Sequence, residues 1–290
     1  MTAGRLTPKT HYDFDPVGRS QQLAGAGILS YITFDQLHPP MIDDESIWRD
    51  GRRWYEGAVK HTLRAAQSCN LRPGATVLDV GGGVGGPARL LVDYFDVSVH
   101  CTSISRAQLK TCRDLNAASQ KWSSRITTRL HDCRRSFPVD KVDCVWSMNM
   151  LYHVGETERF LANAHDALRS GGKLMIDDWM LTPRGTDADR RVLETHFISP
   201  HFAVREELIE QVNRSGLRIE RLLELGHVGR THLARHFEEQ FTTHFGGRIV
   251  AANPVHGVTM ARQFREAILQ TIDLYAAERL TYCVLLATKD

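Results

Sequence analysis

A glycine-rich turn between an apolar strand and a helix constrains the fold of this chain more than any other feature of its sequence. Residues 77–80 read Val-Leu-Asp-Val, as a buried strand does, and the turn that follows carries Gly81, Gly83 and Gly85. Glycine adopts positive φ angles without steric strain and lets backbone N–H groups approach a ligand closely. Residues 87–92 then begin a helix. The segment therefore predicts a strand–turn–helix unit that binds a ligand at its turn.

Two known patterns fit these glycines, and the residues further along the chain separate the two. Gly81-x-Gly83-x-x-Gly86 satisfies the dinucleotide-binding fingerprint, which also expects an Asp or Glu about 20 residues later to hold a ribose hydroxyl. The second predicted strand, residues 97–102, carries no acid at its end. A nicotinamide cofactor is therefore disfavoured.

The second pattern is an acidic residue followed by x-Gly-x-Gly-x-Gly, which Asp79 and the turn match. It resembles motif I of the class I S-adenosylmethionine-dependent methyltransferases. The run Thr102-Ser103-Ile104-Ser105-x-x-Gln108 resembles the T-L-S-x-x-Q variant of many small-molecule methyltransferases. The Gly-Gly-Pro-Ala-Arg continuation at 85–89 resembles the branch that contains tocopherol, sarcosine and bacterial natural-product methyltransferases.

This resemblance implies S-adenosyl-L-methionine as the cofactor and places its parts along successive strand ends. The glycine turn would cradle the methionine portion, with Ser103 and Gln108 near the ribose. Asp132 matches the acid that accepts a hydrogen bond from the adenine amine, and a helix N-cap is the alternative interpretation of the same residue. The cofactor-binding residues predicted in this way are Asp79, Gly81, Gly83, Gly85, Ser103, Gln108, Asp132, Cys133 and Ser147.

Apolar strands alternate with helical segments from residue 76 to about 225, which favours a parallel sheet with helices on both faces. The resemblance implies that the last strand inserts antiparallel between the fifth and sixth. Strands are predicted at 76–80, 97–102, 126–130, 142–148, 173–177, 217–225 and 281–288, with a tight turn at Ser170-Gly171-Gly172. The predicted α/β architecture is a Rossmann-like seven-stranded methyltransferase sheet, divided into a helical N-terminal cap (1–70), a cofactor-binding core (71–227), a helical lid insert (228–277) and a closing strand (278–290).

The candidate catalytic residues follow the fourth and fifth strands. His153 comes shortly after strand 142–148, where members of this family often carry a histidine. An imidazole takes a proton at neutral pH without large tuning, so we expect His153 to act as a base or to orient the substrate. A structural histidine is the alternative. Asp178 is predicted to hydrogen-bond a substrate group, and Tyr152 and Trp179 to bind the substrate, with a purely structural Trp179 as the alternative.

The two segments outside the alternation are predicted to enclose a small substrate. Residues 1–70 carry the aromatic side chains Tyr12, Phe14, Tyr31, Phe34, Trp48, Trp54 and Tyr55. In residues 228–277, apolar side chains recur at i, i+4 in two stripes, which indicates helices. Such stripes usually pack onto a core, whereas an insert at this place also forms substrate pockets in relatives, and both interpretations stay open. The stripes are Leu233, Phe237 and Phe241, and Phe264, Ile268 and Ile272.

His232 and His236 stand one helical turn apart, a spacing that two zinc ligands can take. A His-Glu-x-x-His arrangement is absent, however, and no ligating cysteine accompanies the pair. We therefore predict no metal. The interpretation that we favour is a polar lining of the lid in which both histidines contact the substrate.

The bulk composition disfavours several classes of function. The chain has 36 basic and 34 acidic side chains, so no electrostatic argument points to nucleic acid or to an anionic membrane. No run of about 20 apolar residues predicts a membrane span. The six cysteines form no Cys-x-x-Cys pair, which is typical of free thiols in a reducing cytosol, and we expect a cytoplasmic protein. A homodimer packed through the aromatic N-terminal segment is a further hypothesis.

The predicted reaction is in-line displacement of a methyl group onto oxygen, nitrogen or carbon of a small, largely apolar secondary metabolite. The sequence does not name the acceptor atom. Some proteins that resemble this chain bind the cofactor but catalyse cyclisation or rearrangement without methyl transfer. A cyclase or isomerase of natural-product biosynthesis is therefore the alternative.

Overall fold

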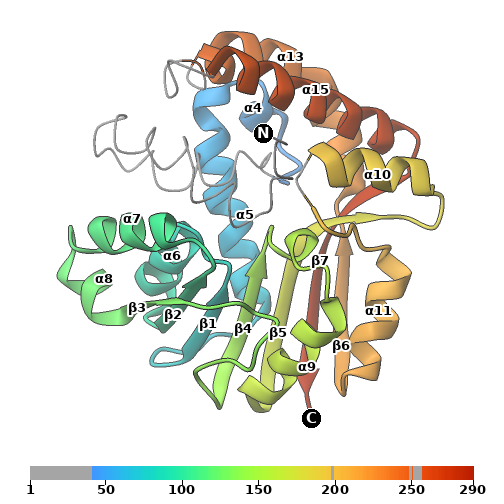
Figure 1. The fold of residues 1–290 in the computed structure, drawn as a ribbon. Coiled ribbons are helices and arrows are strands. Elements are labelled where there is room, and N and C mark those ends of the chain that lie inside the picture. The colour runs from blue at the N-terminus through green and yellow to red at the C-terminus, as the bar shows by residue number, and fades with distance from the viewer. Residues whose placement is uncertain (1–40, 197–198, 248–249, 251–256) are drawn as a thin grey trace, which may run out of the picture.

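The computed structural model describes residues 41–196, 199–247, 250 and 257–290. Its centre is a seven-stranded mixed sheet with the order β3-β2-β1-β4-β5-β7-β6 (Figure 1). β7 runs antiparallel to β5 and β6, which confirms the predicted insertion of the last strand, and the remaining pairs are parallel. The strands are β1 (Thr76–Val80), β2 (Ser98–Ser103), β3 (Ile126–Leu130), β4 (Val142–Met148), β5 (Leu168–Leu181), β6 (Leu217–Glu224) and β7 (Leu280–Lys289).

Helices cover both faces of the sheet because its central strands are apolar on both sides. One buried apolar cluster joins α5, α6, α7 and the lid helices to the first face, and a second joins α9 and α11 to the other face. The helical elements from α5 to α11 are α5 (Trp54–Ser68), α6 (Gly86–Phe95), α7 (Arg106–Asn116), α8 (Gln120–Arg125), the 3-10 turn η2 (Leu151–His153), α9 (Thr157–Ala167), α10 (Asp187–His196) and α11 (Arg205–Arg214).

The fifth strand is longer than predicted. β5 continues through the segment Ser170-Gly171-Gly172, for which the sequence predicted a tight turn before the strand. The pairing of β5 with β4 changes register at this point, so the segment is an irregularity within the strand. Gly171 has a φ of 72° there. A glycine at positive φ serves a turn and a bulge equally well, which is why the prediction of a turn was wrong.

The described part of the N-terminal cap packs against the lid. Its helices are α4 (Glu45–Trp48), the 3-10 turn η1 (Gly51–Arg53) and α5. The backbone N–H of Gly51 donates to Oε1 of Gln240 at 2.6 Å, and Nε2 of Gln240 donates to the carbonyl of Arg49 at 2.6 Å. The aromatic residues Tyr12, Phe14, Tyr31 and Phe34 lie outside the described residues, so the homodimer hypothesis and the domain division stay predictions.

The insert between β6 and β7 is helical, and its apolar stripes pack onto the core. Leu233, Phe237 and Phe241 are buried in the first cluster, and the Phe237 and Phe241 rings lie 5.7 Å apart. This confirms the packing interpretation of the stripes, while a substrate pocket under them stays a prediction. The elements of the lid are α12 (Gly226–Val228), the π-helix η3 (Gly229–Leu233), α13 (Ala234–Gln240), the π-helix η4 (Phe241–Phe245) and α15 (Gly257–Ala276).

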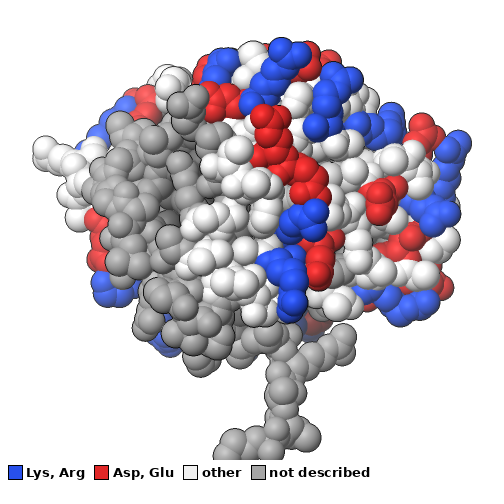
Figure 2. Space-filling view, turned by 90° about the horizontal axis from the view of Figure 1, so that it is seen from above, with Lys and Arg blue, Asp and Glu red and all other residues white. Residues whose placement is uncertain are grey.

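The described surface seen from above mixes both signs of charge. Figure 2 shows acidic and basic side chains side by side on this face. Among the charged side chains of the described residues, Arg265 pairs with Glu238 and Arg235 with Glu45. No helix within the described ranges is long and apolar enough to cross a membrane. The mixed charge agrees with the small net charge of the chain.

One buried carboxylate holds the sharp turn that follows β4. Asn149 has a φ of 51° in this turn, and η2 begins two residues later. Oδ2 of Asp178, from β5, accepts the backbone N–H groups of Met150 at 3.1 Å and Leu151 at 2.7 Å, and Oδ1 accepts that of Trp179 at 2.8 Å. Burial raises the pKa of Asp178 to about 8. Asp178 therefore fixes the backbone of the turn.

We expect Asp178→Ala to lower the free energy of unfolding by about 2–4 kcal/mol, because three buried N–H groups would lose their acceptor. Urea denaturation at pH 6 measures this change. Asp166→Ala, at a side chain that is 84% exposed, is the matched control and should change stability little. An equal loss in both variants would contradict the role of Asp178 in the turn.

The raised pKa of Asp178 also predicts a pH dependence of stability. Because its pKa in the folded chain, about 8, lies above the ordinary aspartate value of 3.8, the folded chain binds more protons between these pH values. The contribution is fully present below about pH 4 and is lost as pH rises toward 8. The stability advantage of the wild type over Asp178→Asn should therefore shrink between pH 5 and pH 8 in urea denaturation. An advantage that grows over this interval would contradict the prediction.

Candidate active site

The glycine turn at the end of β1 is built from left-handed backbone. Gly81, Gly83 and Gly85 have φ angles of 73°, 56° and 80°. The N–H of Gly82 donates to the carbonyl of Thr102 at 2.9 Å, which ties the turn to the end of β2. α6 begins immediately after Gly85. The strand–turn–helix unit predicted from the sequence is therefore present.

Side chains beneath the turn leave no room for a larger residue. A Cβ atom at Gly81 would lie 2.2 Å from Cγ of Met150, and one at Gly85 would lie 2.5 Å from Sγ of Cys112. The predicted binding residue Asp79 is buried, and its Oδ2 would lie 2.2 Å from a Cβ at Gly82. The position of Asp79 supports the ordering of the turn.

Arg89 supports the same turn, although the sequence analysis assigned it no role. It is fully buried on α6, where Nη1 donates to Oδ1 of Asn116 at 2.9 Å. Its guanidinium lies 5.7 Å from the centre of the Trp122 ring. The one signal in the sequence was a charged residue within the apolar stretch that starts this helix.

Ser103 and Gln108 are brought together at the end of β2. The Ser103 hydroxyl donates to Oε1 of Gln108 at 2.9 Å, and Oγ of Ser105 caps α7 by accepting the N–H of Gln108 at 3.2 Å. Thr102 donates from its hydroxyl to the carbonyl of Asp79 at 3.1 Å. The end of β2 is thus a preformed polar shelf next to the glycine turn.

Asp132 lies beyond the end of β3 in a short turn that does not open a helix, so the N-cap interpretation was wrong. Its carboxylate accepts hydrogen bonds from the backbone and the guanidinium of Arg134, which lowers its pKa. Cys133 follows, and burial raises the pKa of its thiol to about 12. Asp132 therefore follows the third of three adjacent strands. The glycine turn follows the first of them, β1, and the Ser103–Gln108 pair follows the second, β2.

Ser147 does not point toward the polar groups that follow β1, β2 and β3. It is fully buried on β4, and its hydroxyl finds no hydrogen-bond partner within the described part of the chain. On β4 the side chains of Val145 and Ser147 point to one face, whereas Trp146 and Met148 point to the other, where the helix after the glycine turn packs. The geometry gives no direct support to cofactor binding by the Ser147 side chain.

Three aromatic side chains meet near the ends of β4 and β5, and we call them the aromatic wall: Tyr152, Trp179 and Phe202. The Tyr152 ring lies 4.2 Å from that of His153, 6.2 Å from that of Trp179 and 5.6 Å from that of Phe202. Trp179 in turn meets Tyr282 of β7 edge-on at 6.0 Å. The structure therefore brings together three of the predicted site residues, Tyr152, His153 and Trp179.

A buried histidine–aspartate pair lies near the end of β4, and the sequence did not predict it. Nε2 of His61, on α5, lies 2.8 Å from Oδ2 of Asp177, on β5 level with the last residue of β4. The Tyr282 hydroxyl donates to Oδ1 of Asn149 at 3.2 Å. No spacing pattern links these residues, because 116 positions separate His61 from Asp177.

The two lid histidines face the N-terminal cap. Nε2 of His232 lies 2.7 Å from Oδ1 of Asp43, and this contact holds the pKa of Asp43 below its usual value. Nε2 of His236 lies 3.7 Å from Glu45, and burial lowers the pKa of His236. Among the described residues, no three His, Cys, Asp or Glu side chains gather as metal ligands do.

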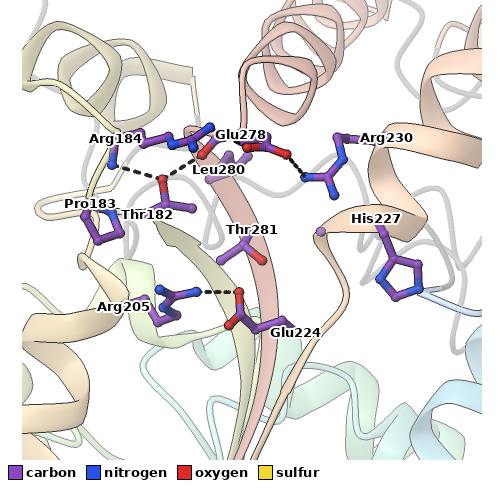
Figure 3. Close-up of a pocket in the computed structure, with 11 residues that line it drawn as sticks. Thr182, Pro183, Arg184, Arg205, Glu224, His227, Arg230, Glu278, Leu280 and Thr281 are labelled. Carbon is purple, nitrogen blue, oxygen red and sulfur yellow. Dashed lines mark hydrogen bonds and ion pairs between the residues drawn. The ribbon is translucent and has the colours of Figure 1, made fainter.

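A pocket of about 460 Å³ opens where β5 and β6 end and β7 begins (Figure 3). Arg205 is paired with Glu224, and Glu278 lies between Arg184 and Arg230. Because each of these arginines already has an acidic partner, the pocket offers little unpaired charge to a ligand. The glycine turn and the aromatic wall lie outside its lining.

Sequence comparison relates the chain to known methyltransferases. The chain is 31% identical over 169 residues to the 27-O-demethylrifamycin SV methyltransferase of Amycolatopsis mediterranei, which covers 57% of this chain and 60% of the relative. The first three curated relatives are matched over 24 to 60% of their own lengths.

Two solved structures share the fold over nearly the whole chain. The cyclopropane synthase MmaA2 from Mycobacterium tuberculosis has a TM-score of 0.74 at 19% identity and covers 98% of this chain and 99% of its own. The [4+2]-cyclase SpnF has a TM-score of 0.70 at 20% identity, with 93% and 96% covered. Residues 52–263 match the family model described as mycolic acid cyclopropane synthetase. The predicted resemblance to class I methyltransferases is confirmed, and the chain belongs to the mycolic acid cyclopropane synthetase family.

Proposed function

We propose that this chain is an S-adenosylmethionine-dependent methyltransferase that moves a methyl group to oxygen, nitrogen or carbon of a small, largely apolar secondary metabolite. The observation that carries the proposal is the row of polar groups at three adjacent strand ends. The glycine turn follows β1, the Ser103–Gln108 pair follows β2, and Asp132 follows β3. Neighbouring strands lie about 5 Å apart, so the row has room for a ligand with amino-acid, ribose and adenine parts.

The residues in this row fit such a cofactor. Gly81 is the exposed member of its turn, whereas the next two glycines are buried, so a ligand can lie against the backbone at Gly81. Ser103 and Gln108 already hold each other in place and require no rearrangement. Asp132 already accepts three N–H groups of Arg134, which leaves about one of the roughly four lone-pair sites of a carboxylate for an amine.

S-adenosylmethionine, when bound, supplies a methyl carbon on a positively charged sulfur. The residues of the chain have to bind it, exclude water and align an acceptor behind that carbon. Asp79 and Arg89 would keep the turn rigid from beneath, and the aromatic wall would close the opposite side. His153, beside Tyr152, would either take a proton from the acceptor or orient it.

Several observations support a small and largely apolar acceptor. Tyr152, Trp179 and Phe202 form a wall of rings over the ends of β4 and β5. The relative named for 27-O-demethylrifamycin SV supports a natural-product acceptor. His232 and His236 contact the cap, which supports a role in holding cap and lid together around the substrate.

A second candidate function is cyclisation or isomerisation of a natural product without methyl transfer. The likeness of the fold to the [4+2]-cyclase SpnF favours this alternative. A cofactor row is compatible with both functions, so the fate of the methyl group is the decisive property.

We expect Gly81→Ala to weaken S-adenosylmethionine binding at least tenfold, because the new Cβ would meet Met150 at 2.2 Å. Isothermal titration calorimetry measures the affinity. Gly74→Ala is the matched control, since Gly74 has a similar φ of 83° but nothing within 4 Å of its Cβ position. Equal affinities of both variants and the wild type would contradict the assignment of the turn.

We expect the purified protein, given methyl-labelled S-adenosylmethionine and a small-molecule extract of its source cells, to transfer the label to a metabolite. Mass spectrometry identifies the product and the methylated atom. Cofactor binding together with an unlabelled, isomerised metabolite would favour the cyclase instead. If the wild type binds no cofactor, the proposed function is wrong.

A further inference from the structure

A histidine–aspartate pair is buried at the carboxyl edge of the sheet, apart from the cofactor row. His61 reaches it from α5, which runs from the lid helices to the sheet (Figure 1), and Asp177 from β5, four residues before that strand ends. The Asp177 side chain is fully buried, and that of His61 is 10% exposed. Burying such a pair is costly and contributes little net stability. A structural role therefore gives a weak account of it.

The surroundings hold the pair in one orientation. Asp177 pairs with Met148 at the last position of β4, and its carbonyl accepts the N–H of Asn149 at 2.8 Å. The hydroxyl of Tyr282 lies between Asn149 and Asp177, and burial together with the Asp177 carboxylate raises the pKa of Tyr282 above its usual value. The second titratable carboxylate nearby, Asp178, points to the opposite face and serves the turn.

The hydrogen-bond pattern assigns a role to each nitrogen of His61. A carboxylate only accepts, so Nε2 carries the hydrogen that it donates to Oδ2 of Asp177. This leaves the lone pair on Nδ1, which makes no hydrogen bond with the described residues. The arrangement is that of an imidazole oriented by a carboxylate with its basic nitrogen left open.

The pair is continuous with the aromatic wall. The His61 ring meets Tyr282 edge-on at 5.7 Å, and Tyr282 meets Trp179 at 6.0 Å. β5 is two strands away from β1, so Asp177, level with Met148 at the end of β4, stands about 10 Å from the glycine turn. This separation leaves room for the methyl group of a cofactor and for an acceptor molecule between the glycine turn and the aromatic wall.

We propose that His61, oriented by Asp177, is the base that deprotonates a hydroxyl acceptor, so that the substrate class is a phenol or an alcohol. The inference rests on the proposed function. The acceptor oxygen forms a bond to the transferred methyl carbon, whose bond to sulfur breaks with its electron pair left on sulfur. The acceptor proton passes to Nδ1 of His61, and the resulting positive charge is stabilised by Asp177 before the proton leaves to water. His153 then orients the acceptor.

The test compares His61→Gln, Asp177→Asn and His153→Ala with His165→Gln as the control. His165 also lies beside an aspartate, Asp166, at 3.3 Å, but on α9 away from the site. We expect His61→Gln to lower kcat at pH 7 roughly 10²- to 10⁴-fold while the cofactor Kd stays within twofold. The deficit should shrink as pH rises toward the pKa of the acceptor, because the acceptor then loses its proton without a base.

A measurement on the cofactor-free protein gives an independent readout. In ¹⁵N spectra of labelled histidine, the signal that His61→Gln removes should report hydrogen on Nε2, and Asp177→Asn should mix the two tautomers. An unchanged tautomer would overturn the orientation by Asp177, also where His61→Gln proves unstable. Wild-type-like activity of His61→Gln, or a product methylated on carbon or nitrogen, would overturn the inference while leaving the methyltransferase function intact. The control should match the wild type throughout.

Discussion

The parallel pairing of β1 with β2 on one side and β4 on the other is the constraint on which the rest of this structure depends. These central strands are buried on both faces, so their backbone becomes accessible to a ligand only beyond their ends. The chain passes to β2 on one side of β1 and later returns to β4 on the other, which opens a crevice at this switch point. The glycine turn, the strained Asn149 and the aromatic wall all stand around it.

Two neighbouring carboxylates show how the sheet distributes roles. Asp177 and Asp178 are adjacent in the sequence and both fully buried, but successive strand residues point to opposite faces. Asp178 accepts three backbone N–H groups and fixes the turn after β4, whereas Asp177 faces α5 and meets His61. The order of residues alone does not separate these two roles, because both side chains are aspartates at neighbouring positions.

Much of the fold could be predicted because its signals are local. β3 and β4 have the predicted bounds, since each is a short run of strand-forming residues between polar turns. A sequence motif could predict that Ser103 and Gln108 lie close together, because only five positions separate them across a strand end and the first turn of a helix. The bulge at Gly171 was not, because a turn and a bulge place the same demand on that residue.

By itself the sequence determined the strand–turn–helix unit, the alternation of strands and helices, and the polar row along β1, β2 and β3. Backbone preferences and apolar periodicity act over a few residues, so the sequence alone is enough to predict the elements that they produce. Only the tertiary structure decided which distant side chains meet: His61 with Asp177, Tyr282 with Asn149, and His232 with Asp43. Those contacts depend on the insertion of β7 into the sheet and on how α5 and the lid dock, and no local preference encodes them.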